Sequence, residues 1–169
     1  QGAGHTHKDG DFKKEVAKGW KALLAMQDRD GLFYHEGLSH QQLYAQAQAT
    51  IAICELYGMT KDQEYKKPAQ LAVDYAVKSQ APEGGWRYTP GQDSDTSVTG
   101  WFVIALQSAM MAGLEVPSPT LEKISKFLDS VQSENGTRYA YRPGSGSTET
   151  RPVAAIAAAH RTRIGRTPL

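Results

Sequence analysis

Two aspartates, Asp93 and Asp95, stand close together in the stretch GGWRYTPGQDSDTS, which runs from Gly84 to Ser97. A carboxyl pair of this kind can perform acid chemistry, in which one protonated carboxyl gives its proton to a substrate. The same residues can begin a helix, because Asp and Ser side chains accept hydrogen bonds from the N–H groups of the first turn. We favour Asp95 or Ser97 as a helix cap and keep catalysis by Asp93 or Asp95 as the alternative.

Glu55 is a third candidate acid, because it is the only carboxylate in two apolar segments, 41–58 and 96–113. A carboxylate that faces a cavity with a shifted pKa is a candidate for a functional site. Gln46, Gln48 and Tyr44 share its segment. Buried polar groups need partners, so these side chains either bond to neighbouring helices or face a central cavity where a ligand could bind.

His5 and His7 form a His-x-His pair and are the candidate metal ligands of the chain. Zinc sites need three or four such ligands, and Cys54, the one cysteine, lies in an apolar run typical of a buried side chain. We therefore expect solvated loop histidines, no metal and no cofactor. The sequence also lacks a phosphate-binding loop, a Gly-x-Ser-x-Gly motif and a Cys-x-x-Cys pair.

Composition limits the classes of partner. The chain has 169 residues, 40% of them hydrophobic, and a formal net charge of +1 without a block of like charge. We expect one domain, 1–169, and neither nucleic acid nor an anionic membrane as partner. No apolar run approaches the roughly 20 residues of a membrane span. The chain starts without Met, so we expect a piece of a longer protein, and its localisation is not indicated.

A repeat of about fifty-three residues organises the elements around these candidates. Gln27, Gln80 and Gln132 are 53 and 52 residues apart, and each is followed four residues later by a glycine. An aromatic residue follows shortly after each glycine, and these three aromatic residues are themselves 53 residues apart. We call these sets the Gln–Gly–aromatic units, and they are Gln27, Gly31 and Phe33; Gln80, Gly84 and Trp86; and Gln132, Gly136 and Tyr139.

Two kinds of helix are predicted to alternate between the units. Charged segments with one apolar face span 13–27, 61–80 and 119–132. Segments that are apolar nearly all round, and therefore buried, span 41–58, 96–113 and 150–160. The pattern predicts an all-α fold of three hairpins, each with an outer and an inner helix. We expect Thr60 and Ser118 to cap helix starts, Pro119 to lie in a first turn, and Gly58 and Gly113 to cap helix ends.

The second unit resembles the glutamine-tryptophan repeat of the squalene-hopene cyclase and oxidosqualene cyclase families. That repeat reads basic-Gly-x2-aromatic-aliphatic-x3-Gln-x3-Gly-x-Trp, and the segment from Tyr75 to Trp86 matches its second half. The stretches GAGHTH and ELYGMT are similar to bacterial prenyltransferase/squalene-oxidase repeat proteins. The resemblance implies part of an α/α toroid of the terpenoid cyclase and protein prenyltransferase superfamily, in which inner helices line a central cavity.

The resemblance also bears on the aspartates. The acid motif of class II terpene cyclases reads Asp-x-Asp-Asp-Thr, and its middle aspartate protonates an alkene. Aligning its threonine with Thr96 places Asp95 on the last aspartate and Ser94 on the proton donor. In this alignment the proton donor is missing. If the motif is moved so that Asp93 and Asp95 fill its first two aspartates, Thr96 falls on the third. Neither alignment completes the motif, so we favour a helix cap over acid chemistry at Asp95.

The function predicted from the sequence is that of a repeat scaffold with an apolar ligand cavity. In each unit the glutamine amide would bridge backbone groups of adjacent helices, and the aromatic ring would cover it. The alternatives are an enzyme that acts on a prenyl or terpenoid substrate and, by fold analogy alone, a carbohydrate-processing enzyme. Expected partners are an apolar small molecule, and either a second copy of the chain or neighbouring repeats of the parent protein.

Overall fold

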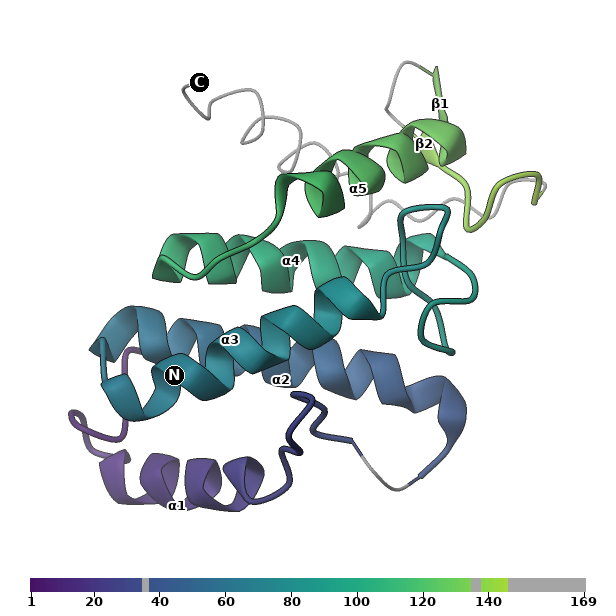
Figure 1. The fold of residues 1–169 in the computed structure, drawn as a ribbon. Coiled ribbons are helices and arrows are strands. Elements are labelled where there is room, and N and C mark those ends of the chain that lie inside the picture. The colour runs from purple at the N-terminus through teal and green to yellow at the C-terminus, as the bar shows by residue number, and fades with distance from the viewer. Residues whose placement is uncertain (35–36, 135–137, 146–169) are drawn as a thin grey trace.

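The computed structural model describes residues 1–34, 37–134 and 138–145, which form a mostly helical fold (Figure 1). A 3-10 turn, η1 (Ser39–Gln41), leads into the second helix, and a short antiparallel pair, β1 (Gln132–Ser133) and β2 (Arg138–Tyr139), follows the last. The α-helices in the described residues are α1 (Lys13–Leu24), α2 (Gln42–Thr60), α3 (Gln63–Lys78), α4 (Thr96–Ala112) and α5 (Ser118–Val131). The predicted all-α class is therefore confirmed.

The inner helices α2 and α4 form the centre of the fold. They pack side by side, α3 packs on both, and α5 packs on α4 (Figure 1). Small and branched side chains between them are fully buried, among them Ala47, Ile53 and Leu106. These helices are buried because they are apolar on nearly every side, as the sequence predicted. Among the described residues, no helix combines the length and apolar character needed to cross a bilayer.

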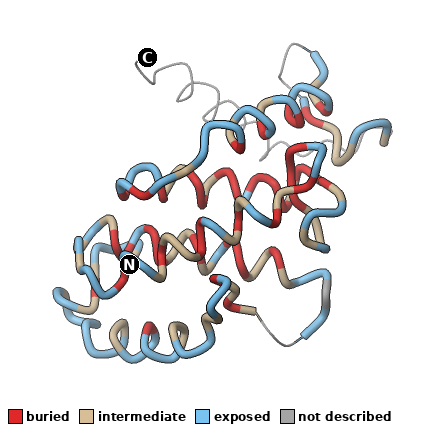
Figure 2. The backbone as a smooth tube through the Cα atoms, in the orientation of Figure 1, coloured by how far each residue is buried: buried red, intermediate tan, exposed pale blue. Residues whose placement is uncertain are grey.

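The outer helices α1, α3 and α5 each bury one face (Figure 2). The buried residues of α3 recur at helical spacing, and they are Tyr65, Ala69, Ala72, Val73 and Ala76. The outer helix α1 buries only Trp20, which meets Tyr65 edge-on with the ring centroids 5.9 Å apart. Amphipathic and apolar helices thus alternate along the described chain. The inner helix predicted for 150–160 lies outside the described residues, and the toroid itself stays a prediction.

Helix starts differ from the predicted caps. The side chain of Asp62, not that of Thr60, caps α3 by accepting a hydrogen bond of 3.1 Å from the Glu64 N–H. The expectation for Thr60 was wrong because α2 continues through it. Ser118 does not cap α5 either, since it is already helical and Pro117 precedes it without a side-chain cap bond.

Helix ends also differ in one case. Gly58 was expected to end α2, but the helix continues to Thr60 and closes at Lys61, whose φ of 49° is left-handed. Gly58 instead serves helix packing, because a Cβ there would lie 3.3 Å from the Cβ of Ala112. Gly113 ends α4 with a φ of 78°, as predicted.

Candidate functional site

The glutamines of the first two units join successive outer helices. The side-chain Nε2 of Gln27, three residues beyond α1, donates a hydrogen bond of 2.9 Å to the carbonyl of Pro68 in α3. Nε2 of Gln80, just beyond α3, donates 3.1 Å to the carbonyl of Thr120 in α5 and 2.9 Å to that of Gly84.

The glycines of the same units allow a close approach of backbones. Gly31 and Gly84 have left-handed φ values of 91° and 104°. A Cβ at Gly31 would collide with the carbonyl oxygen of Leu71, and one at Gly84 would collide with that of Lys123. Leu71 and Lys123 are 52 residues apart, so the two turns rest on equivalent points of α3 and α5.

The aromatic residues Phe33, Trp86 and Tyr139 are all buried. The indole Nε1 of Trp86 donates 2.9 Å to the carbonyl of Ala76, and its ring stacks on Phe102 of α4 with the centroids 4.8 Å apart. The Trp86 ring therefore fills space between α3 and α4, and its Nε1 satisfies a backbone carbonyl of α3.

Two inner-helix side chains hold these turns in place. Gln46 of α2 accepts 2.9 Å from the N–H of Phe33 and donates 2.9 Å to the carbonyl of Gly31. Thr99 of α4 accepts 2.9 Å from the N–H of Trp86. Of the two roles left open for Gln46, the structure supports bonding to a neighbouring segment. The 53-residue spacing of Gln46 and Thr99 was a signal for their shared role that the sequence analysis missed.

The third unit differs from the others. Gln132 forms the first residue of β1 and pairs with Tyr139, and its Nε2 lies 3.4 Å from Oδ1 of Asp129 in the preceding helix α5. Within the described residues, no outer helix follows α5 to receive its amide. Gly136 lies outside the described residues.

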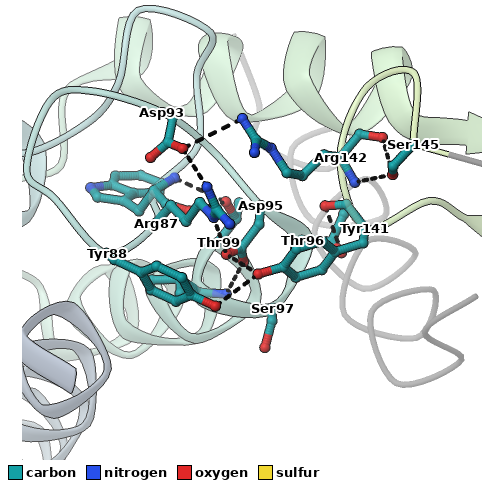
Figure 3. A network of polar contacts seen from close by, with 12 residues as sticks. Arg87, Tyr88, Asp93, Asp95, Thr96, Ser97, Thr99, Tyr141, Arg142 and Ser145 are labelled. Carbon is teal, nitrogen blue, oxygen red and sulfur yellow. Dashed lines mark hydrogen bonds and ion pairs between the residues drawn. The ribbon is translucent and has the colours of Figure 1, made fainter. Parts of the chain in front are cut away.

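Asp95 lies at the start of α4 and is completely buried (Figure 3). Its Oδ1 accepts 2.8 Å from the N–H of Val98, which makes it the helix cap, as favoured from the sequence. Its Oδ2 accepts 2.8 Å from the hydroxyl of Tyr141 and lies 3.4 Å from Nε of Arg87. Asp95 thus ties α4 to the segment that follows β2.

The surroundings of Asp95 affect its acidity. Burial raises the pKa of Asp95, and the hydrogen bonds from the Val98 N–H and the Tyr141 hydroxyl oppose this effect. Burial also raises the pKa of the Tyr141 hydroxyl, and hydrogen bonding with Tyr88, 3.0 Å away, acts in the same direction. A buried carboxyl with a raised pKa can in principle act as a proton donor.

Asp93 belongs to the same network but is more exposed. Its Oδ2 lies 2.7 Å from a guanidinium nitrogen of Arg87 and 3.4 Å from one of Arg142. The Arg87 guanidinium also lies 4.7 Å from the ring centre of Tyr88. The two aspartates therefore meet at Arg87, and both have structural partners (Figure 3). Tyr141 and Arg142 were missed from the sequence, although Tyr141 follows Tyr88 by the repeat spacing.

Glu55 lies far along α2 from this network and is exposed. It lines a groove of about 600 Å³ between the last turns of α2 and α4, closed on one side by residues 1–4. Ser108 of α4, 53 residues on, points its hydroxyl at Oε1 of Glu55 over 3.5 Å. The wall also contains Cys54, whose thiol pKa burial raises to about 12, so this side chain is inert.

The two histidines lie in the N-terminal segment and do not share a ligand set. Nε2 of His7 lies 2.9 Å from Oδ2 of Asp62, the cap of α3, and Lys8 reaches the same oxygen at 2.9 Å. His5 packs edge-on against Phe12 with the ring centroids 5.0 Å apart. No group of three potential metal ligands occurs in 1–34, 37–134 and 138–145.

Three kinds of comparison with known proteins were made: with family models, with curated proteins and with solved structures. No family model, no curated protein and no solved structure matches the chain.

Proposed function

We propose that the chain is a non-catalytic repeat scaffold, similar to the prenyltransferase and squalene cyclase repeat proteins and part of an α/α toroid, that offers an apolar groove to a small molecule. The observation that supports the scaffold is the recurrence of one contact. Gln27 and Gln80 donate to Pro68 and Thr120, and these acceptors are 52 residues apart on successive outer helices. A contact repeated at the period of the sequence is what stacked repeat units require.

The groove beside Glu55 supports the binding part of the proposal. Its volume of about 600 Å³ lies within the range of roughly 300–1,000 Å³ typical of ligand sites. Met59 and Met111 line it and are exposed. Methionine side chains adapt to varied apolar partners, and exposed apolar surface on otherwise buried helices often marks a binding site.

A neutral apolar dye tests this proposal. Nile red should bind the wild type, and Met111→Arg should weaken its affinity by about tenfold, because a guanidinium would occupy the groove. Met26→Arg is the matched control, since Met26 is also exposed but lies outside the groove. Fluorescence titration gives both affinities. An equal loss of Nile red affinity in the two variants, or no binding by the wild type, would show that the groove is not the binding site.

The second candidate function is an enzyme that acts on a prenyl or terpenoid substrate. The observation that favours it is the raised pKa of the buried Asp95 carboxyl. Incubation with squalene and with polyprenyl diphosphates, followed by product analysis, tests it. Turnover that Asp95→Asn abolishes without loss of stability would establish the enzyme and overturn the scaffold proposal.

A further inference from the structure

The groove beside Glu55 lies on a surface with very little charge. The helices α2 and α4 contain 19 and 17 residues, and Glu55 is their only charged side chain. Their exposed face nevertheless holds large apolar side chains, with Met59 48%, Trp101 38% and Met111 72% exposed. Helices that face only water usually carry several charges, so this face is suited to an apolar occupant.

The one carboxylate in this surface has a single, long side-chain contact within the described residues. The Ser108 hydroxyl is 3.5 Å from Oε1 of Glu55, at the outer limit of a hydrogen bond. No ion pair joins Glu55 to another residue in the part of the chain that the structure describes. An unpaired carboxylate beside apolar surface favours a cation, and hydrogen bonds to it from a cation are the strong ones.

Within the groove, the charged Glu55 lies next to the apolar side chains of Met59 and Met111. Glu55 and Ser108 occupy equivalent repeat positions on α2 and α4, and their oxygens lie 3.5 Å apart in the lining of the groove. Met59 is one turn further along α2, and Met111 is about one turn further along α4. A ligand with a charged head at Glu55 would place its tail between the two methionines.

We propose that this groove binds a linear aliphatic ammonium compound. The ammonium group donates hydrogen bonds to the Glu55 carboxylate and the Ser108 oxygen, and the alkyl chain packs on Met59 and Met111. This inference rests on the proposed groove and adds the chemical class of its ligand. The charge complementarity of a single carboxylate in apolar surroundings decides for an amine over a neutral or anionic lipid.

Calorimetric titration with three eight-carbon probes tests the inference at pH 7 and low salt. Octylamine is protonated at this pH, since alkylammonium groups of the lysine type have a pKa near 10.4. Octylammonium should bind about tenfold more tightly than octanol, and octanoate should bind more weakly than both. The preference for the amine should decrease as salt rises, because the ion pair is partly exposed.

Glu55→Gln is the decisive variant, because it keeps the shape and removes the charge. It should reduce the ratio of octylammonium to octanol affinity to about one, while Glu83→Gln, at an exposed position outside the groove, should leave the ratio unchanged. Equal binding of amine and alcohol by the wild type, or an amine preference that survives Glu55→Gln, would overturn the inference and leave the apolar groove standing. Binding of none of the three probes would overturn the groove as well.

Discussion

At the scale of single residues, the two oxygens of Asp95 have different tasks. Oδ1 caps α4 through the N–H of Val98, and Oδ2 receives the hydroxyl of Tyr141. An amide can replace the capping oxygen, whereas a methyl group can replace neither. Substitutions at this one position therefore separate a structural role from an acidic one.

Asp95→Asn should be tolerated, because Asn caps a helix about as well as Asp. Asp95→Ala should cost about 1–3 kcal/mol, since it removes the cap and leaves the hydroxyl of Tyr141 without this acceptor. Denaturant unfolding measures both. A large loss in Asp95→Asn equal to that in Asp95→Ala would show that the negative charge, and not the cap, holds this end of α4.

The same carboxyl gives a prediction for pH. Burial raises the pKa of Asp95, so the folded state takes up this proton at a higher pH than the unfolded state. Its contribution to stability is fully present below the unfolded pKa of about 3.9 and is lost as pH rises through the folded pKa. The stability of the wild type minus that of Asp95→Asn should therefore fall as pH rises from about 3.5 to 7. A constant or rising difference between the two unfolding free energies contradicts this.

Trp86 is the residue whose loss should cost most. Trp86→Ala should reduce the free energy of unfolding by about 3–5 kcal/mol, because it empties a fully buried site and removes the donor to Ala76. Trp101→Ala should cost clearly less, since Trp101 is 38% exposed. A double-mutant cycle of Trp86→Ala with Gln80→Ala should be non-additive, because both residues support the Gly84 turn. Additive losses of unfolding free energy would mean that Gln80 and Trp86 contribute to stability independently.

At the scale of elements, the contribution of each glutamine to stability is tested by replacing the glutamines of the three units one at a time. Gln27→Ala and Gln80→Ala should each reduce stability by about 1 kcal/mol, because each loses a bond between successive outer helices. Gln132→Ala should change it by less than about 0.5 kcal/mol, since its described side-chain contact is with Asp129 of the preceding helix α5 and joins no second outer helix. Thermal or denaturant unfolding of the three variants decides. Equal effects at all three positions would contradict the role of the amide as a link between helices.

Helix type and position were predictable from the sequence because apolar periodicity dominates them. The switch between one-sided and all-round apolar patterns marked α1 to α5, and the repeat spacing marked the three units. Gly113 was predictable as a helix end for a local reason, because glycine tolerates the left-handed φ that often ends a helix. These features depend on residues close together in the chain.

The remaining features depend on contacts between distant residues. Asp62 caps α3 in place of Thr60 because α2 continues past Gly58, which lies close to Ala112 of α4. The network at Asp95 needs Tyr141, which lies 46 residues away along the chain. A single sequence gives no direct signal for such a pairing, and only the spacing of Tyr88 and Tyr141 pointed to it.

At the scale of the whole molecule, one kind of turn joins successive outer helices. Gly31 rests on α3 and Gly84 rests on α5, each beside a bridging glutamine and a buried ring. Pairing with a second copy of the chain or with further repeats stays a prediction, which light scattering coupled to size-exclusion chromatography checks. A clean monomer would rule out the second copy.

The most direct test of the central claim compares three alanine substitutions at left-handed glycines by denaturant unfolding. Gly31, Gly84 and Gly91 have φ values of 91°, 104° and 71°, so alanine is strained at each. A Cβ at Gly31 or Gly84 would strike the backbone of the next outer helix, whereas one at Gly91 would meet no atom within 4 Å. We predict a loss of about 1 kcal/mol for Gly91→Ala and of about 3 kcal/mol or more for each of the others. Equal losses in all three variants would contradict the claim that these turns join the outer helices.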